Sequence, residues 1–222
     1  MVQERIPERE AILDSEQIEE YIQLSEKLME YVYQDVVNQA MRLVSLHGRV
    51  LDVGTGFGML AITLAQGKPD VQVIGLDISA TMIEAGKRVV SKKGLVPRVS
   101  FEVADARAMP FPDNCFDGVI SYGSLHHWLG PELVFNEINR VRRPEGMIYV
   151  ADLRRDQPRV PLWFLYEMVR LRAGKRMADE MVSSVNAAYT PSEIGPILGK
   201  TTITHWQPKH SFYGINIFSS QK

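Results

Sequence analysis

The chain is 222 residues long, with 45% hydrophobic and 23% charged residues and a formal net charge of −2. This composition is that of a globular protein and excludes a disordered, collagen-like or disulfide-stapled chain. No run of about 18 apolar residues occurs and the first ten residues are charged, so we expect neither a membrane span nor a signal peptide. The single cysteine, Cys115, excludes an internal disulfide and is consistent with a cytoplasmic location.

Charge is distributed unevenly along the chain. Residues 1–47 carry four Lys or Arg against ten Asp or Glu, whereas residues 140–176 carry ten against four. Such blocks are more often two solvated faces than a nucleic-acid groove. The basic stretch also lacks the aromatic residues interleaved with Arg that single-strand binding uses, so nucleic acid is not an expected partner.

Helical and strand-like segments alternate along most of the chain. Apolar residues at helical spacing predict a broken helix over residues 15–46. Five strands are predicted at residues 49–53, 71–76, 98–103, 116–121 and 147–151. Between them we expect an apolar segment at 59–65, a helix from the N-cap Ser79 to about Lys93, and a helix over 131–143. This alternation is typical of a parallel sheet.

The alternation stops after the fifth predicted strand. Residues 158–188 predict two inserted helices, and Thr190-Pro191-Ser192-Glu193 is a capping box that begins another. Residues 201–206 and 211–218 predict strands joined by Gln207-Pro208-Lys209-His210, hence an antiparallel hairpin. The predicted fold class is α/β: a three-layer, Rossmann-like, seven-stranded and mostly parallel sheet with an antiparallel C-terminal strand, N-terminal helices and a helical lid after strand five.

The strongest motif is Gly54-Thr55-Gly56-Phe57-Gly58, which follows the first predicted strand. Glycines permit positive φ and let backbone N–H groups approach a ligand at a helix N-terminus. The dinucleotide pattern G-x-G-x-x-G is not met, because Met59 stands at its third glycine position. Asp77 ends the next strand roughly 20 residues later, which suits hydrogen bonds to ribose hydroxyls. The motif therefore predicts a nucleoside ligand without an obvious pyrophosphate.

Four segments occur in a characteristic order. They are Leu51-Asp52-Val53-Gly54-Thr55-Gly56-Phe57-Gly58; Gly75-Leu76-Asp77-Ile78-Ser79 with Met82; Ala104-Asp105-Ala106 with residues 109–117; and Ser121-Tyr122-Gly123-Ser124-Leu125-His126-His127-Trp128. Over about residues 30–155 the chain thereby resembles the class I S-adenosylmethionine-dependent methyltransferases, close to the small-molecule subgroup (methyltransferase type 11) that includes quinone-biosynthesis enzymes. The resemblance specifies cofactor and fold, but not the methyl acceptor.

The resemblance implies S-adenosyl-L-methionine as cofactor and S-adenosyl-L-homocysteine as product. It implies that Asp77 holds the ribose, Asp105 accepts from the adenine amino group and Ser121 meets the methionyl end. The full implied cofactor set is Tyr33, Asp52, Gly54, Thr55, Gly56, Gly58, Asp77, Ile78, Met82, Asp105, Ala106 and Ser121. Core packing is an equal alternative for Tyr33 and Met82.

We expect one methyltransferase domain over residues 1–222. Its parts are an N-terminal helical cap (1–47), a cofactor-binding core (48–157), a helical lid (158–188), and a C-terminal helix and hairpin (189–222).

Methyl transfer is an in-line attack on an activated sulfonium, so the protein need only hold the nucleophile close, aligned and desolvated. A base is required only where the nucleophile carries a proton that must leave. His126, His127 and Tyr122 are the catalytic candidates, since an imidazole titrates near neutrality. The alternative for either histidine is a helix cap or packing against Trp128.

Three residues are candidates for binding the acceptor. Arg154 and Arg155 follow the fifth strand and suit an anionic group, unless Asp152 or Asp156 pairs with them. Trp163 represents the aromatic residues of the predicted lid, which suit a ring-bearing acceptor or simple core packing. We expect no metal site, and a monomer or a homodimer.

Sequence motifs also narrow the acceptor. The segment after strand four lacks the Asn/Asp-Pro-Pro-aromatic motif of base-amino methyltransferases, and one cysteine is too few for arsenic methylation. A small-molecule acceptor with an oxygen, nitrogen or carbon nucleophile is therefore expected. An RNA methyltransferase, a nicotinamide oxidoreductase and a non-catalytic cofactor-binding assembly partner are the alternatives.

Overall fold

The computed structural model describes residues 4–8, 18–19, 21–23, 25, 30–43, 47–203, 205–210 and 214–219. The helices are α2 (Glu30–Leu43), α3 (Met59–Gly67), α4 (Ala80–Lys92), α5 (Pro131–Val141), α6 (Arg159–Ala187), α7 (Pro191–Leu198) and the short 3-10 helix η1 (Leu125–His127). The strands are β1 (Gly48–Val53), β2 (Val71–Asp77), β3 (Val99–Val103), β4 (Phe116–Tyr122), β5 (Arg142–Leu153), β6 (Trp206–His210) and β7 (Gly214–Ser219). Part of the helix predicted over 15–46 lies outside the described residues.

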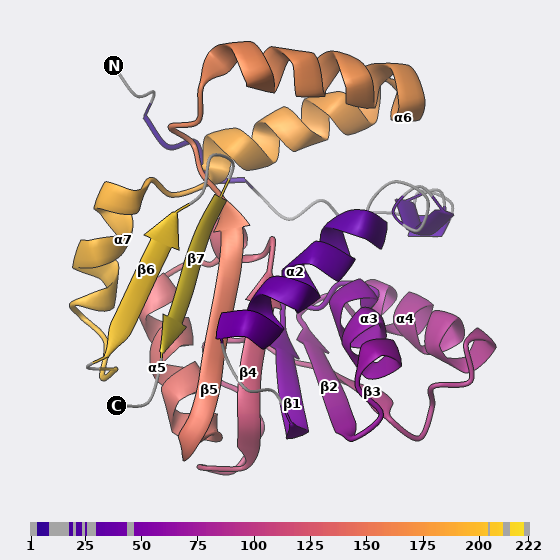
Figure 1. Cartoon of the computed structure of the whole chain (residues 1–222), viewed down its shortest axis with the longest axis vertical. Coiled ribbons are helices and arrows are strands. Elements are labelled where there is room, and N and C mark those ends of the chain that lie inside the picture. The colour runs from indigo at the N-terminus through magenta and orange to yellow at the C-terminus, as the bar shows by residue number, and fades with distance from the viewer. Residues whose placement is uncertain are drawn as a thin grey trace.

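The strands form one sheet in the order β3-β2-β1-β4-β5-β7-β6 (Figure 1). Strands β1 to β5 are parallel to one another, and β7 is antiparallel to both β5 and β6. The predicted α/β fold with a seven-stranded, mostly parallel sheet is thus confirmed. The direction in which the chain adds strands reverses between β1 and β4. A crevice for a ligand is expected at the carboxyl ends of these two strands.

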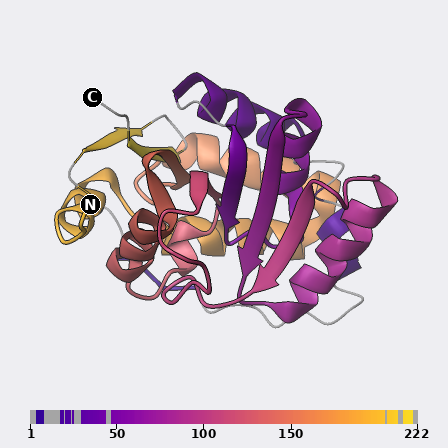
Figure 2. The same ribbon diagram turned by 90° about the horizontal axis from the view of Figure 1, so that it is seen from below.

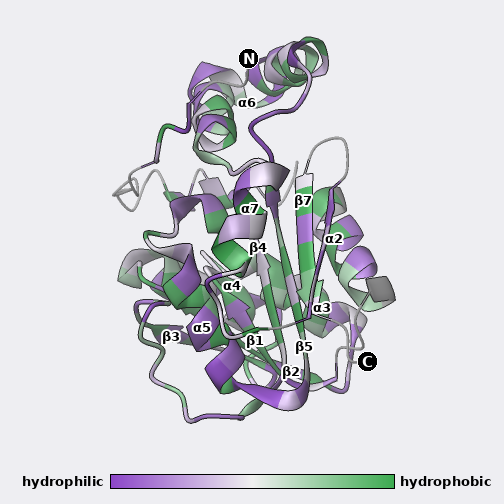
Figure 3. Cartoon of the chain, turned by 90° about the vertical axis from the view of Figure 1, so that its left-hand side faces the viewer, coloured by the Kyte–Doolittle hydropathy of each residue, from purple (hydrophilic) through white to green (hydrophobic). Residues whose placement is uncertain are grey.

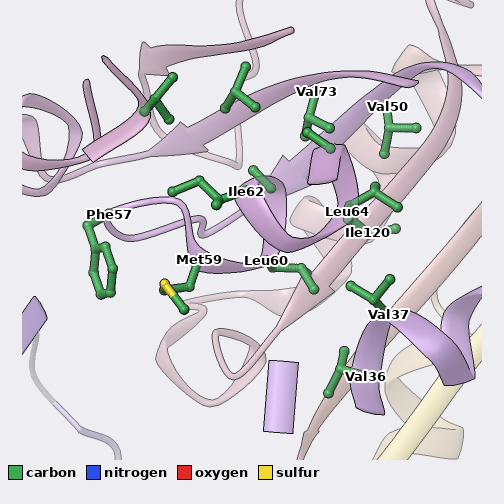
Figure 4. Packing of buried hydrophobic residues seen from close by; sticks show 14 of the residues in the cluster. Val36, Val37, Val50, Phe57, Met59, Leu60, Ile62, Leu64, Val73 and Ile120 are labelled. Carbon is green, nitrogen blue, oxygen red and sulfur yellow. The ribbon is translucent and has the colours of Figure 1, made fainter. Parts of the chain in front are cut away.

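Helices cover both faces of the sheet. One buried cluster joins α2, α3 and α4 to β1 and β2, through residues such as Val37, Leu60, Ile62 and Val73 (Figure 4). A second cluster on the other face joins α5 and α7 to the sheet. Seen from below, α2 and α5 lie on opposite sides of the twisted strands (Figure 2). The predicted three layers are therefore present.

Helix α6 lies beyond the carboxyl ends of the parallel strands, where it covers their edge (Figure 1). Gly174 breaks it with φ 85° and ψ 166°, so α6 consists of two helical halves that fold back on each other, as predicted. Hydrophobic and hydrophilic residues are mixed along α6, whereas the central strands are mostly hydrophobic (Figure 3). No helix in the described part of the chain is long and apolar enough to cross a membrane.

Two stretches that the sequence placed between elements fall within strands. Residues 144–146 lie in β5 as a bulge, because the pairing with β4 skips from Arg142 to Met147, and the Arg142 side chain donates 2.9 Å hydrogen bonds to the carbonyls of Pro144 and Gly146. The link 207–210 belongs to β6, which begins where the predicted strand 201–206 was to end. Pro208 is tolerated there because β6 is an edge strand, where a missing N–H costs no ladder bond.

Helix α4 packs closely against the loop after β1 at Gly86. A Cβ at this position would lie 2.9 Å from both the carbonyl oxygen of Phe57 and the ring of Phe101. A Cβ on Gly67, at the end of α3, would meet no atom within 4 Å.

We predict that Gly86→Ala lowers the free energy of unfolding by about 1–3 kcal/mol, because overpacking outweighs the better helix propensity of alanine. Gly67→Ala is the matched control and should change it by less than about 0.5 kcal/mol. Urea denaturation of both variants measures this. Equal stabilities would contradict the close packing of α4 on the loop.

Candidate active site

A cavity of about 1830 Å³ opens at the carboxyl ends of β1, β2 and β4 and extends under α6. Typical small-molecule pockets measure roughly 300–1,000 Å³. The cavity is therefore large enough for two ligands side by side. Asp77, Ile78 and Met82 line one end of it, and Tyr122, His126 and His127 line another part.

The glycine loop is shaped mainly by its contacts with the protein. Gly54 has φ 70°, and a Cβ there would lie 2.4 Å from Cβ of Ser124. A Cβ on Gly58 would lie 2.7 Å from the Phe101 ring. The N–H groups of Gly54 and Thr55 both donate to the carbonyl of Leu76, at 2.8 and 3.0 Å. Only Gly56, of the three glycines, has open space where a Cβ would be.

Two carboxylates lie behind this loop. Asp77 accepts hydrogen bonds from the N–H groups of Gly56 (2.7 Å) and Ser79 (2.9 Å), and burial raises its pKa. Asp52 is buried and accepts a 2.7 Å hydrogen bond from the Thr55 hydroxyl. Burial raises the pKa of Asp52 to about 7. Ser79 caps α4 as predicted, at 3.3 Å from the N–H of Met82.

The cavity wall near β3 contains the remaining predicted adenine contacts. Ile78, Met82, Asp105 and Ala106 all line the cavity. The Asp105 carboxylate is paired side-on with the Arg107 guanidinium, at 2.6 to 3.0 Å, and these hydrogen bonds lower the pKa of Asp105. Asp105 keeps lone pairs for a further donor, since each carboxylate oxygen can accept more than one hydrogen bond.

Ser121 has a different place from the predicted one. Its side chain is fully buried, donates to the carbonyl of Val53 at 2.7 Å, and is not among the described residues that line the cavity. Its neighbour Ser124 does line the cavity. Ser121 therefore supports the strand end, and its predicted contact with the methionyl group is not supported by this position.

Two tyrosines meet at the cavity wall. Tyr33 of α2 and Tyr122 of β4 stack edge-to-face, with ring centroids 5.5 Å apart. Burial, and then the charge of Asp152, raise the pKa of Tyr122 well above its usual value. Tyr122 is therefore a neutral phenol near pH 7, a donor rather than a base.

The two predicted histidines lie together. Their ring centroids are 4.1 Å apart, and His126 is only 3% exposed. His126 Nδ1 lies 2.9 and 3.0 Å from the two Asp152 oxygens. Burial lowers the pKa of His126, but the charge and hydrogen bond of Asp152 outweigh it and the net pKa is raised. Burial and the neighbouring His126 lower the pKa of His127 to about 4.

The predicted acceptor-binding residues lie elsewhere. Arg154 pairs with Asp156 at 2.7 Å, and Arg155 pairs with Glu193 at 2.5 Å. Trp163 is 57% exposed. None of the three is among the described residues that line the cavity, so the prediction that they bind the acceptor is not supported.

Several cavity residues were not singled out from the sequence. The residues from α6 are Leu165, Met168, Val169, Arg172, Met177, Glu180, Met181, Ser184 and Val185. Glu8 and Asp152 also line the cavity. Helical periodicity shows which residues share a face of α6, but not which face turns inward. Glu8 is separated from the histidines by most of the chain, and no spacing motif could have linked them.

The sheet order, the crevice between β1 and β4 and the cavity above it define a class I S-adenosylmethionine-dependent methyltransferase fold. The chain matches the methyltransferase domain family over residues 45–207. It therefore belongs to that family.

Comparison with individual proteins supports this assignment. Methyltransferase GfsG of Streptomyces halstedii is 34% identical over 140 residues, which are 63% of this chain and 48% of that protein. Demethylmenaquinone methyltransferase of Thermus thermophilus is 36% identical over 104 residues, 47% of this chain and 46% of that protein. A crystal structure of a Methanococcus maripaludis protein superposes with a TM-score of 0.76 at 22% identity, covering 97% of both chains. The chain spans about half the length of these two curated relatives.

The buried Asp52 makes the unliganded protein pH-sensitive. Its folded pKa of about 7 lies above the usual 3.8, so the folded state holds a proton that the unfolded state releases. The contribution of Asp52 to the free energy of unfolding should therefore be greatest below pH 4. It should fall by up to ~1.4 kcal/mol per pH unit as the pH rises towards 7.

We predict that Asp52→Asn removes this dependence, because the amide oxygen still accepts from Thr55 while the proton equilibrium is absent. Urea denaturation between pH 5 and 8 compares the variant with the native chain. Asp70→Asn, at an exposed turn, is the control and should retain the native slope. Parallel curves for the native chain and Asp52→Asn would refute the raised pKa.

Proposed function

We propose that the protein transfers a methyl group from S-adenosylmethionine to a small-molecule nucleophile. The observation that carries the proposal is one continuous cavity, which extends from Asp77, behind the glycine loop, to a mainly apolar chamber under α6. Family membership supplies the reaction class. Similarity of fold alone would not show that the protein catalyses a reaction.

The reaction needs little from the protein beyond position. The acceptor's lone pair attacks the methyl carbon in line with the sulfur. The carbon–sulfur bond breaks, and sulfur keeps the electron pair, which yields S-adenosylhomocysteine. A proton leaves the acceptor where the attacking atom carried one. Holding the two reactants in contact and free of water accounts for much of the acceleration.

The cofactor is proposed to lie along the loop after β1. Asp77, held by two backbone N–H groups, is placed to accept from ribose hydroxyls, and the open side of Gly56 leaves room for the ligand. Ile78 is 48% exposed on the cavity wall, where an adenine ring would cover it. Asp105 is proposed to receive the adenine amino group.

The acceptor is proposed to bind in the chamber below α6. Leu165, Met168, Val169, Met177 and Met181 make this part apolar and adaptable in shape. Tyr122, His126 and His127 form its polar side and are proposed to face the reacting group. An apolar, ring-bearing acceptor with one polar group fits this chamber, and a relative named for demethylmenaquinone is consistent with that class.

The alternative of an RNA acceptor is less well supported. The basic stretch 140–176 is largely neutralised within the chain, since Arg140, Arg143, Arg154, Arg155 and Arg170 all form ion pairs with Asp or Glu. Few of its charges remain to track a phosphate backbone.

We predict that Asp77→Asn weakens binding of S-adenosylhomocysteine by roughly 10- to 100-fold, because a charge-assisted hydrogen bond is worth about 1.5–3 kcal/mol. Calorimetric titration measures this, with Asp70→Asn as a control that should bind like the native chain. Absence of binding by the native chain would contradict the proposed function. Unchanged binding by Asp77→Asn would contradict the placement of the ribose.

A matched pair on α6 tests the acceptor chamber. Val169 lines the cavity, whereas Leu171, two residues on, is 77% exposed. We predict that Val169→Asn raises the acceptor KM at least about tenfold, because an unpaired amide is costly in an apolar pocket. Leu171→Asn should leave KM unchanged.

The assay is release of S-adenosylhomocysteine with a panel of quinols, phenols and hydroxylated polyketides. Both variants should bind S-adenosylhomocysteine like the native chain, which separates acceptor binding from cofactor binding. Equal KM values for the two variants would show that the acceptor binds elsewhere.

A further inference from the structure

Three potential metal ligands meet at the polar side of the chamber. Glu8, His126 and His127 each offer one ligand atom, and these atoms all lie within 4.8 Å of one another. Glu8 Oε2 is 3.6 Å from His126 Nε2 and 3.9 Å from His127 Nε2. Both distances are those of ion pairs and are too long for hydrogen bonds, so the lone pairs of the three groups remain available to a metal ion.

His126 is held in the form that a metal requires. Asp152 faces Nδ1 with both oxygens and also accepts from the backbone N–H of His126 at 2.7 Å. Nδ1 therefore carries a proton, and Nε2, on the other side of the ring, is the nitrogen that a metal ion would bind in place of a second proton. Nε2 is buried and has no hydrogen-bond partner among the described residues. A carboxylate behind a histidine in this way is the usual support for a metal-binding imidazole.

Glu8 is brought to the histidines by a fixed N-terminal segment. The Arg5 side chain donates to the carbonyls of Ala187 (2.6 Å) and His126 (2.7 Å) and stacks on Tyr189. The backbone N–H of Ile6 donates to Asn186 at 3.1 Å. The Glu8 carboxylate itself accepts a 3.0 Å hydrogen bond from the Ser184 hydroxyl. These contacts orient an anionic ligand towards the two imidazole rings.

We propose that Glu8, His126 and His127 bind a divalent transition-metal ion in the acceptor chamber. Two imidazoles and one carboxylate suit Zn²⁺, Mn²⁺ or Fe²⁺ better than Mg²⁺ or Ca²⁺. Metal–ligand bonds of about 2.0–2.2 Å require the three ligand atoms to move somewhat closer together. Small torsional adjustments of the side chains, without a change of rotamer, are sufficient for this movement. All three residues line the cavity, so the remaining coordination positions face the acceptor.

The role of the ion follows from those open positions. An ion held by Glu8, His126 and His127 would lower the pKa of an acceptor hydroxyl beside Tyr122, so that the hydroxyl would release its proton to solvent before it attacks. This role rests on the proposed methyl transfer, whereas binding of the ion does not. Direct measurement of metal binding therefore tests the site separately from the reaction.

The test is calorimetric titration of chelator-treated protein with Zn²⁺, together with visible absorption of the Co²⁺ form. We expect one equivalent to bind, and Glu8→Gln and His127→Asn each to weaken the affinity at least about tenfold. Glu8→Gln keeps an oxygen to accept from Ser184, so its fold should persist. His205→Asn, in an exposed segment before β6, is the matched control and should bind like the native chain.

Binding of S-adenosylhomocysteine by every variant verifies that the fold is intact. Absence of stoichiometric Zn²⁺ binding, or equal Zn²⁺ affinity in the native chain and Glu8→Gln, would overturn the site. Zn²⁺ binding that depends on Glu8, in protein that methylates nothing in the acceptor panel, would support the site and count against the proposed function. Methyl transfer at an unchanged rate in Glu8→Gln that binds no Zn²⁺ would overturn the metal's role.

Discussion

The close contact between the loops after β1 and β4 is the constraint on which the cavity depends. Gly54 has no Cβ, and Ser124 occupies the space that one would fill. The hydroxyls of Ser121 and Ser124 bond to each other and to the carbonyl of Val53, which binds the two strand ends together. The crevice can therefore open only beyond these loops, with Asp77 on one side and Tyr122 and His126 on the other.

Acidic side chains outnumber arginines in the lining of the cavity. Asp52, Asp77 and Asp152 line it, and burial raises the pKa of the first two. Of the described arginines that line the cavity, Arg107 is paired with Asp105, and Arg172 belongs to α6. S-adenosylmethionine carries a positive sulfonium and a positive amino group. Negative charge in the lining of the cavity attracts such a ligand.

The sequence was sufficient to predict features that depend on local chemistry. Alternating strands and helices predicted the sheet, and Ser79 and Thr190 marked helix starts that the structure confirms. Asp77 ends one parallel strand and His126 follows another, so the sequence predicted that both lie at the carboxyl edge of the sheet. Arg154 and Arg155 follow β5 at the same edge. Arg154 pairs with Asp156, which the sequence offered as an alternative, whereas the pair of Arg155 with Glu193 depends on side-chain direction, which sequence order does not give.

The edge of the sheet and the break in α6 explain two other differences between the predicted and the observed structure. Pro208 is a turn signal in isolation, yet an edge strand tolerates it, and only the completed sheet shows that β6 is the edge. Trp163 carries the aromatic signal of the lid, but the fold of α6 at Gly174 decides which face of the helix meets the cavity. The sequence predicted two helices over residues 158–188, but only the structure shows that Gly174 separates them and sets the direction of both halves.

The N-terminal segment completes the site from the opposite end of the chain. Arg5 joins the carbonyl of His126, in η1, to the carbonyl of Ala187, at the end of α6. The same segment therefore fixes the polar side of the chamber and the helix that covers it. If α6 moves to admit an acceptor, the contacts of Arg5 and of Glu8 with Ser184 must change with it. A movement of α6 would therefore change the polar groups of the chamber together with the access to it.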